Sequence, residues 1–315
     1  MKVLVTGADG FVGGWLARRL LQDGHNVVGT HRRGGGPSPV LTSVEAARLE
    51  WRELELASGA SVEGATQGRW DAVVHLAALS SGSEARQDPG LAWEVNAAGT
   101  ARLAEVLGLR VATRQGDPNF LLVSTGEVYG AGKGARAESD PPQPCSPYSG
   151  SKLGAEVAAL EVSRRTGLRV IIARPFPHTG PGQDIRFVVP ALASRIVAAK
   201  RIGAPTIKTG SLESVRDFLD VRDVAEAYLA LLGRGTAGEV YNIASGEGRQ
   251  LTEVLRRLEQ LTQWRVRPEL EPRLARRSDI THLVGDAGKL RRETGWQPQI
   301  AFDRTLQDLL DAQAN

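Results

Sequence analysis

The feature that most constrains the fold is a strand–turn–helix–strand pattern near the amino terminus of this 315-residue sequence. Residues 2–6 are a short β-branched run, and the glycine-rich segment 7–13 follows it directly. Apolar residues then recur at helical spacing over 11–21, and residues 25–30 form a second apolar run. These segments predict a β-α-β unit, in which a helix connects two strands.

The same alternation continues through the first half of the chain. Further strands are expected at 70–77, 120–124 and 168–173, with helical stretches near 91–108 and 148–166 between them. Strands that alternate with helices pair in parallel, because each helix carries the chain back across the sheet. The sequence therefore predicts an α/β fold with a doubly wound, Rossmann-type parallel sheet.

The pattern changes after the fifth expected strand, where prolines and glycines break regular structure. We expect a nucleotide-binding domain of residues 1–174 plus about 212–243. A smaller, interwoven C-terminal domain of about 175–211 plus 244–315 would complete the molecule. The small and basic residues 133–137 are expected to form a mobile loop. Later strands are expected at 215–221 and 239–243, and later helices at 188–200, 223–232, 251–262 and 303–312.

Composition excludes several classes of protein. The net charge of +3 is small for this length, and no basic block with interleaved aromatics indicates nucleic-acid binding. No apolar run approaches the roughly 18 residues that span a membrane, so we expect no membrane association. The single cysteine, Cys145, cannot form an internal disulfide, which favours a reducing cytoplasm. We expect no metal site.

The glycine-rich segment is typical of a dinucleotide site. Gly7, Gly10 and Gly13 follow the spacing Gly-x-x-Gly-x-x-Gly between a strand and a helix. Such glycines permit a tight turn and let a pyrophosphate approach the backbone, and the helix N-terminus adds free amides and a favourable dipole. A glycine-rich turn with no ligand is the alternative interpretation.

The end of the second expected strand bears on the choice of cofactor. NAD-binding folds usually place a carboxylate there for the ribose 2′-hydroxyl. Here His31, Arg32 and Arg33 occupy that region, and no carboxylate lies within residues 26–40. Arginines suit a 2′-phosphate, so we expect NADP(H) rather than NAD(H), although NAD(H) stays possible. Two solvated loop arginines are the alternative.

Tyr148 and Lys152 are the candidate chemical pair. Residues four apart share one face of a helix, and a nearby ammonium lowers the pKa of a phenol from its usual value of about 10. The pair is therefore a candidate general acid/base. Thr125 follows the expected strand 120–124, at the sheet edge where ligands bind. The alternative for the pair is an ordinary solvated helix face, and the alternative for Thr125 is a backbone cap at the strand end.

Taken together, these patterns resemble the extended short-chain dehydrogenase/reductases, the nucleotide-sugar epimerase/dehydratase family. The resemblance runs nearly end to end and depends on an ordered set of short motifs. They are 6–13, His75-Leu-Ala-Ala78, Asn96 with Gly99-Thr100, 124–130, Tyr148-x-x-x-Lys152, Arg174-Pro-Phe176, His178 with 180–183, Arg216-Asp-Phe218, Asp220-Val-Arg-Asp223 and Tyr241-Asn242.

The resemblance implies a role for each matching residue. Tyr148 would be the catalytic acid/base, Lys152 would bind the nicotinamide ribose and lower the tyrosine pKa, and Thr125 would bind the reacting sugar oxygen. The cofactor would lie against the three glycines, Tyr148 and Lys152, and also against Phe11, Val12, His31, Arg32, Arg33, Glu53, Leu54, Leu76, Ala77, Ala78, Asn96 and Pro175. The substrate would contact Ser80, Ser81, Thr125, His178, Val188, Val189, Arg216 and Arg276, with the two arginines on its diphosphate.

Within the family, the C-terminal half is most similar to enzymes that reduce the 4-keto group of GDP-4-dehydro-6-deoxy-D-mannose. Dehydratases of the family carry Asp-Glu or Ser-Glu directly after the threonine, whereas this chain has Gly126 and Glu127. Glycine supplies no leaving-group acid, although Glu127 could still act as a base. The resemblance thus favours an NAD(P)H-dependent reductase of a nucleotide sugar, GDP-linked above UDP- or dTDP-linked.

Two alternative functions remain open, and the sequence departs from the family pattern at two positions. A related epimerase or dehydratase is the first alternative, and a non-catalytic NADP(H)-sensing regulator, which should lack the Tyr–Lys pair, is the remote one. Pro177 and Ser211 stand where the family usually has asparagine, so recognition of the nucleotide base would differ. Relatives dimerise through the helices near 91–108 and 148–166, which implies a homodimer here.

Overall fold

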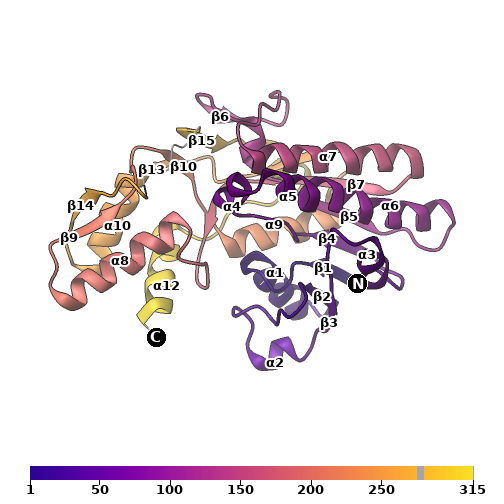
Figure 1. Cartoon of the computed structure of the whole chain (residues 1–315), viewed down its shortest axis with the longest axis horizontal. Coiled ribbons are helices and arrows are strands. Elements are labelled where there is room, and N and C mark those ends of the chain that lie inside the picture. Colours follow the sequence, from indigo (N-terminus) through magenta and orange to yellow (C-terminus); the bar gives the residue numbers. More distant parts are fainter. Residues whose placement is uncertain (275–279, 315) are drawn as a thin grey trace.

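The centre of the molecule is a seven-stranded parallel sheet (Figure 1). The structure is a computed structural model, and it describes residues 1–274 and 280–314. The order of strands reverses between β1 and β4, as in a doubly wound Rossmann sheet, so the predicted fold class is confirmed. From one edge to the other the strands are β3 (Glu50–Glu53), β2 (Asn26–His31), β1 (Lys2–Thr6), β4 (Ala72–His75), β5 (Asn119–Val123), β7 (Arg169–Pro175) and β12 (Val240–Ile243).

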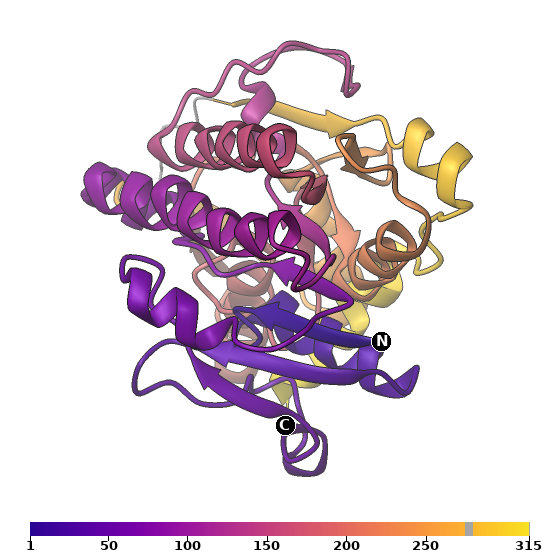
Figure 2. The same ribbon diagram turned by 90° about the vertical axis from the view of Figure 1, so that its right-hand side faces the viewer.

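Alternate residues of the strands feed two separate cores. Val3 and Val5 of β1 join the core under α1 (Phe11–Gln22) and α9 (Val221–Arg234). Leu4, which points to the other face, joins the core under α3 (Gly59–Ala65), α6 (Gly99–Ala112) and α7 (Pro147–Thr166). Because side chains alternate along a strand, helices cover both faces of the sheet. Figure 2 shows α6 and α7 lying side by side on their face.

The helix expected near 91–108 is three consecutive segments. A short helix α5 (Pro89–Trp93) leads into one π-helical turn, Glu94–Ala98, and α6 follows without a break. Single π turns inside helices are often found at functional sites. Two further short helices, α2 (Ser43–Ala46) and α4 (Gly82–Gln87), lie in the loops after β2 and β4.

The C-terminal elements gather beside the sheet, on the left of Figure 1. Their buried apolar residues, which include Leu192, Leu255 and Leu306, form a third core. The helices of this cluster are α8 (Val188–Ile202), α10 (Leu251–Thr262) and α12 (Phe302–Ala314). The short helix α11 (Gly288–Thr294) instead packs against α9 and β12. The small sheets comprise β13 (Gly248–Gln250), β10 (Val215–Asp217), β15 (His282–Gly285) and β6 (Ala135–Arg136), then β11 (Leu219–Asp220) with β8 (His178–Thr179), and β14 (Arg267–Leu270) with β9 (Thr206–Thr209).

Two local expectations are wrong. The strand expected at 215–221 is two strands that belong to different sheets, β10 and β11. The segment 133–137 contains β6, which pairs with β15, because Val284 and Gly285 supply backbone partners from a distant part of the chain. The division into two domains stays a prediction; β10 pairs outside the large sheet, whereas α9 packs on it and β12 forms its edge.

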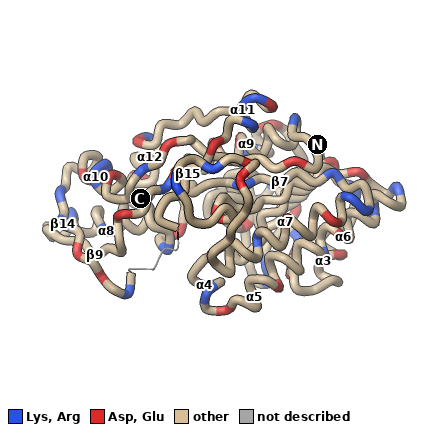
Figure 3. The backbone as a smooth tube through the Cα atoms, turned by 90° about the horizontal axis from the view of Figure 1, so that it is seen from above, with Lys and Arg blue, Asp and Glu red and all other residues tan. Residues whose placement is uncertain are grey.

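Basic and acidic residues are not segregated along the backbone in the view from above. Figure 3 shows lysine and arginine interspersed with aspartate and glutamate along the chain. Among the described helices, none combines the length and the apolar character that a membrane crossing requires.

Candidate active site

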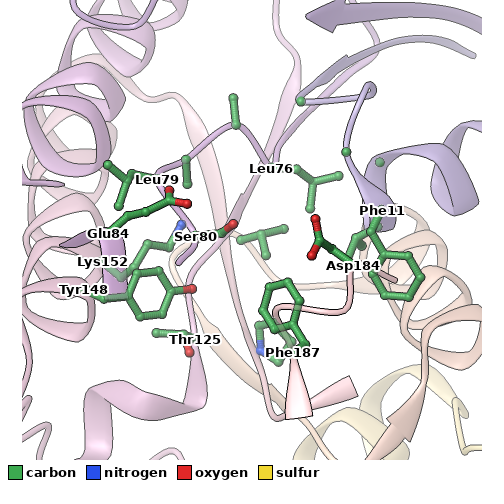
Figure 4. A pocket seen from close by; sticks show the side chains of 18 of the residues that line it. Phe11, Leu76, Leu79, Ser80, Glu84, Thr125, Tyr148, Lys152, Asp184 and Phe187 are labelled. Carbon is green, nitrogen blue, oxygen red and sulfur yellow. The ribbon is translucent and has the colours of Figure 1, made fainter. Parts of the chain in front are cut away.

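A cavity of about 1210 Å³ lies at the carboxyl edge of the central sheet (Figure 4). Ligands in doubly wound sheets bind at this edge, near the point where strand order reverses. The structure brings most of the predicted site residues to its wall. They are Gly7, Gly10, Phe11, Val12, Gly13, His31, Arg32, Leu54, Leu76, Ala77, Ala78, Ser80, Thr125, Glu127, Tyr148, Lys152, Pro175, His178, Val188, Val189 and Arg216.

The glycine turn leaves no space for side chains. Gly7 has φ of +71°, and a Cβ on it would lie 2.8 Å from the backbone nitrogen of Ala77. A Cβ on Gly13 would lie 2.1 Å from the carbonyl oxygen of Gly7. Gly10, the residue before α1, has no side chain to cap the helix, so amides at this end stay available. The turn therefore fits the pyrophosphate of a dinucleotide.

Charges of both signs lie at the far end of the cavity. Arg32 lines it, as expected, but so does Glu55, which follows β3. A Glu55 carboxylate oxygen accepts a hydrogen bond of 3.1 Å from the backbone amide of Arg33. Glu55 was not among the expected cofactor contacts, although the neighbouring Leu54 was. The parallel pairing of β2 with β3 brings the two strand ends together.

Helix α7 presents the predicted chemical pair. Ser146 and Ser149 form a reciprocal capping box at its start, and Pro147 occupies the first turn. Tyr148 and Lys152 then lie one turn apart on the cavity wall, with Thr125 beside the phenol (Figure 4). Thr125 also accepts a hydrogen bond of 3.2 Å from the Glu127 amide, so the expected strand-end cap is present too.

The pKa of Tyr148 departs from its ordinary value in the direction opposite to our expectation. Burial raises this pKa, and the negative charge of Glu127 raises it further, while the Thr125 hydroxyl acts in the other direction. Burial also lowers the pKa of Lys152, to about 8, against the attraction of Glu156. The phenol is thus protonated at neutral pH, the form that can donate a proton.

A buried ion pair that sequence reasoning missed lies behind Lys152. Glu156, one turn further along α7, accepts from Arg174 at 2.7 and 3.0 Å and also from the Ser124 hydroxyl. The guanidinium of Arg174 lies 4.8 Å from the ring centre of Tyr129. The i, i+4 spacing from Lys152 was the available signal, since it places Glu156 on the same face of the helix.

Glu127 and Gly126 differ sharply in what they can contribute. Burial raises the pKa of Glu127, and the positive charges of Arg216 and Arg86 oppose that shift. At Gly126 a Cβ would lie 2.9 Å from the ring of Phe176. The Phe176 ring therefore occupies the place that a side chain after Thr125 would need. Glu127 is the one acidic side chain of this short turn, Gly126–Tyr129.

Two aromatic rings on the cavity wall, those of His178 and Phe11, contact each other. His178 stacks on Phe11, with ring centres 6.5 Å apart and planes inclined by 10°. Its Nδ1 lies 3.0 Å from the carbonyl oxygen of Phe176, and burial lowers its pKa. The neighbouring Pro177 accepts a backbone hydrogen bond from Leu219, which ties β8 to β11.

Four predicted contact residues do not line the cavity, and their contacts with a ligand stay predictions. Asn96 is buried in the π turn and binds the backbone of Leu79 and the hydroxyl of Ser151. Ser81 caps α4 through the amide of Glu84. Arg33, in the loop after β2, and Glu53, the last residue of β3, are exposed and do not line the cavity. Arg276, which was also predicted to contact the substrate, lies outside the described residues.

Comparisons with known proteins agree with this geometry. A family model described as GDP-mannose 4,6 dehydratase matches residues 4–309. A GDP-6-deoxy-D-mannose reductase from Pseudomonas aeruginosa is 37% identical over 244 residues, which cover 76% of this chain and 79% of that protein. A structure of RMD from Pseudomonas aeruginosa in complex with NADPH is 31% identical, covers 99% of this chain and 98% of the other, and superposes with a TM-score of 0.83. A UDP-glucose 4-epimerase from Thermus thermophilus in complex with NAD is 28% identical, covers 100% and 99% of the two chains, and has a TM-score of 0.85.

Fold, cavity and sequence likeness together define a dinucleotide-dependent oxidoreductase. The chain belongs to the GDP-mannose 4,6 dehydratase family, within the nucleotide-sugar epimerase/dehydratase group of extended short-chain dehydrogenase/reductases.

Proposed function

We propose that the protein is an NAD(P)H-dependent reductase of a nucleotide-activated 4-keto-6-deoxy sugar, with GDP-4-dehydro-6-deoxy-D-mannose as substrate and GDP-D-rhamnose as product. The observation that carries this proposal is the placement of Tyr148 beside Thr125 and one helical turn from Lys152, in the cavity that the glycine turn also lines. The likeness to a GDP-6-deoxy-D-mannose reductase supports the choice of sugar.

In this mechanism the bound dihydronicotinamide supplies a hydride to C4 of the sugar. Tyr148 donates its proton to the keto oxygen as the new C–H bond forms, so that a secondary alcohol leaves the site. Thr125 holds the same oxygen from the end of β5, and Lys152 stabilises the phenolate that remains. Arg216 lines the same cavity, where it would bind the diphosphate and hold the sugar in position for the transfer.

Dehydration and epimerisation are the alternative reactions of the family. A 4,6-dehydratase must also protonate a leaving hydroxyl, and Phe176 leaves no room for an acid at position 126. Glu127, whose pKa burial raises, could serve as a base alone. Simple reduction does not need this additional acid, and it is therefore the reaction that we favour.

Absorbance at 340 nm tests the proposal directly. With the GDP-4-keto sugar we expect one equivalent of NADPH to be consumed for each sugar reduced, because the hydride leaves with the product. GDP-mannose supplied in place of the keto sugar should give no 4-keto product. Product formation without net loss of NADPH would show an epimerase or dehydratase instead.

We further propose NADP(H) as the favoured cofactor, with Arg32 on the 2′-phosphate. Replacement by alanine should weaken NADPH binding by about tenfold or more and leave NADH binding unchanged, because an ionic hydrogen bond is worth about 1.5–3 kcal/mol. Fluorescence titration measures both constants. Arg33→Ala is the matched control, since Arg33 does not line the cavity. Equal losses for both nucleotides, or tighter NADH than NADPH binding to the unsubstituted protein, would contradict the assignment.

The two-domain division, a homodimer and a cytoplasmic location remain proposals. Exposed apolar side chains on the helices that the resemblance implicates in dimerisation support the dimer: Trp93 on α5, Leu109 on α6 and Val157 on α7.

A further inference from the structure

Tyr228 is a buried tyrosine whose hydroxyl has no assigned partner. It lies on α9, its side chain is fully buried, and its ring lines the cavity. Within residues 1–274 and 280–314, no group forms a hydrogen bond with its Oη. Leaving a buried hydroxyl unsatisfied costs about 1–3 kcal/mol, and such groups are rare in folded proteins. A ligand that binds there would remove this cost.

The other tyrosines show that the chain normally satisfies this group. The sequence has four tyrosines. The hydroxyl of Tyr129 donates to Asn242 at 2.8 Å, and that of Tyr241 donates to Glu293 at 2.5 Å. Tyr148 has the Thr125 hydroxyl beside it. Tyr228 is therefore the exception among them, and it is the second tyrosine on the cavity wall.

The two cavity tyrosines come from opposite faces of the sheet. Tyr148 lies on α7 and Tyr228 on α9, which belong to the two different cores described above. Their side chains are close enough that Tyr148 adds to the effect of burial in raising the pKa of Tyr228. Tyr228 thus lies at the reacting end of the cleft, where the ring that gives up the hydride must sit.

Other buried polar atoms without a partner in the same cavity indicate the kind of ligand. Of the six buried polar side-chain atoms without a partner in the described chain, three belong to cavity residues: Thr179 Oγ1, Gln183 Oε1 and Tyr228 Oη. The amide nitrogen of Gln183 donates to the carbonyl of His178, which leaves its oxygen as an acceptor. Hydroxyls that donate or accept, together with an amide oxygen, suit a neutral carboxamide better than a phosphate.

We infer that the Tyr228 hydroxyl binds the carboxamide of the nicotinamide ring and so fixes the ring between α7 and α9. This inference rests on the proposed function, since it assumes a nicotinamide cofactor. It makes Tyr228 a positioning residue: it holds the ring that carries the hydride, while Tyr148 serves the sugar oxygen.

Tyr228→Phe tests the assignment through binding and stability. We expect NADPH affinity to fall about three- to tenfold, the worth of a neutral hydrogen bond. Affinity for 2′-phospho-ADP-ribose, which lacks nicotinamide, should stay unchanged. Because the substitution removes an unsatisfied hydroxyl, the melting temperature of the ligand-free protein should stay the same or rise, while the stabilisation by NADPH should shrink. Titration calorimetry and thermal unfolding measure these quantities.

Tyr129→Phe is the matched control. It removes a satisfied hydroxyl, so we expect a lower melting temperature with and without NADPH, and an unchanged ratio of the two affinities. If Tyr228→Phe changes neither affinity, or lowers both equally, the carboxamide contact is refuted while the proposed function stands. If the unsubstituted protein binds no NADPH, the proposed function and this inference both fail.

Discussion

Tyr148→Phe should lower the turnover number for the 4-keto sugar by about 100- to 10,000-fold, the range typical for loss of a general acid. The ring and its packing stay in place, but no proton can reach the keto oxygen from this position. The dissociation constant for NADPH should stay within about twofold, because the hydroxyl serves the sugar rather than the cofactor. Steady-state rates at 340 nm and fluorescence titration of NADPH provide the two measurements.

Tyr241→Phe is the control for this loss. Tyr241 is buried at the edge strand β12, and its hydroxyl binds Glu293 rather than any cavity residue. Its substitution should leave the turnover number within about twofold of the unsubstituted enzyme. Turnover by Tyr148→Phe at a rate close to that of Tyr241→Phe would remove Tyr148 from the role of acid.

The central strands were predictable because each buries a continuous apolar run, as β1 and β5 do. Edge strand β3 was not predictable, since three of its four residues are Glu50, Arg52 and Glu53. Without an apolar face it shows no alternation of apolar and polar residues. The two-residue strand β6 exists only because β15 pairs with it. Pairing between segments so far apart leaves no trace in the local sequence.

The contrast between local sequence pattern and tertiary contact also separates the site residues that were predicted from those that were missed. Tyr148 and Lys152 were found because helical spacing is a local property. The predicted direction of the Tyr148 pKa shift was wrong, because burial and the charge of Glu127 both depend on tertiary structure. Glu55 and Tyr228 were not predicted, although Glu55 follows the expected contact Leu54 and Tyr228 lies on α9, which begins within the motif 220–223. Tertiary packing brings both residues to the cavity, and no local pattern distinguishes them from their neighbours.

Replacing Glu156 by glutamine should lower the free energy of unfolding by about 3–5 kcal/mol, because it leaves the Arg174 guanidinium buried without its counter-charge. Side-chain exposure is only 6% for Arg174 and 4% for Glu156, so water cannot compensate. Urea-induced unfolding measures the loss. The double variant with methionine at both positions should recover most of it, since a buried pair can be replaced by apolar groups at little cost.

Glu161→Gln is the matched control on the same helix. Glu161 pairs with Arg165 at the surface, where water and salt screen the interaction, so its loss should leave unfolding unchanged within error. Glu156→Gln should also alter catalysis at high pH, since Glu156 helps Lys152 keep its proton against burial. Without that charge the Lys152 pKa falls below about 8, so the pH above which activity declines should move downward. An unchanged pH profile in a variant that has lost stability would show that the ion pair supports the fold alone and does not set the charge of Lys152.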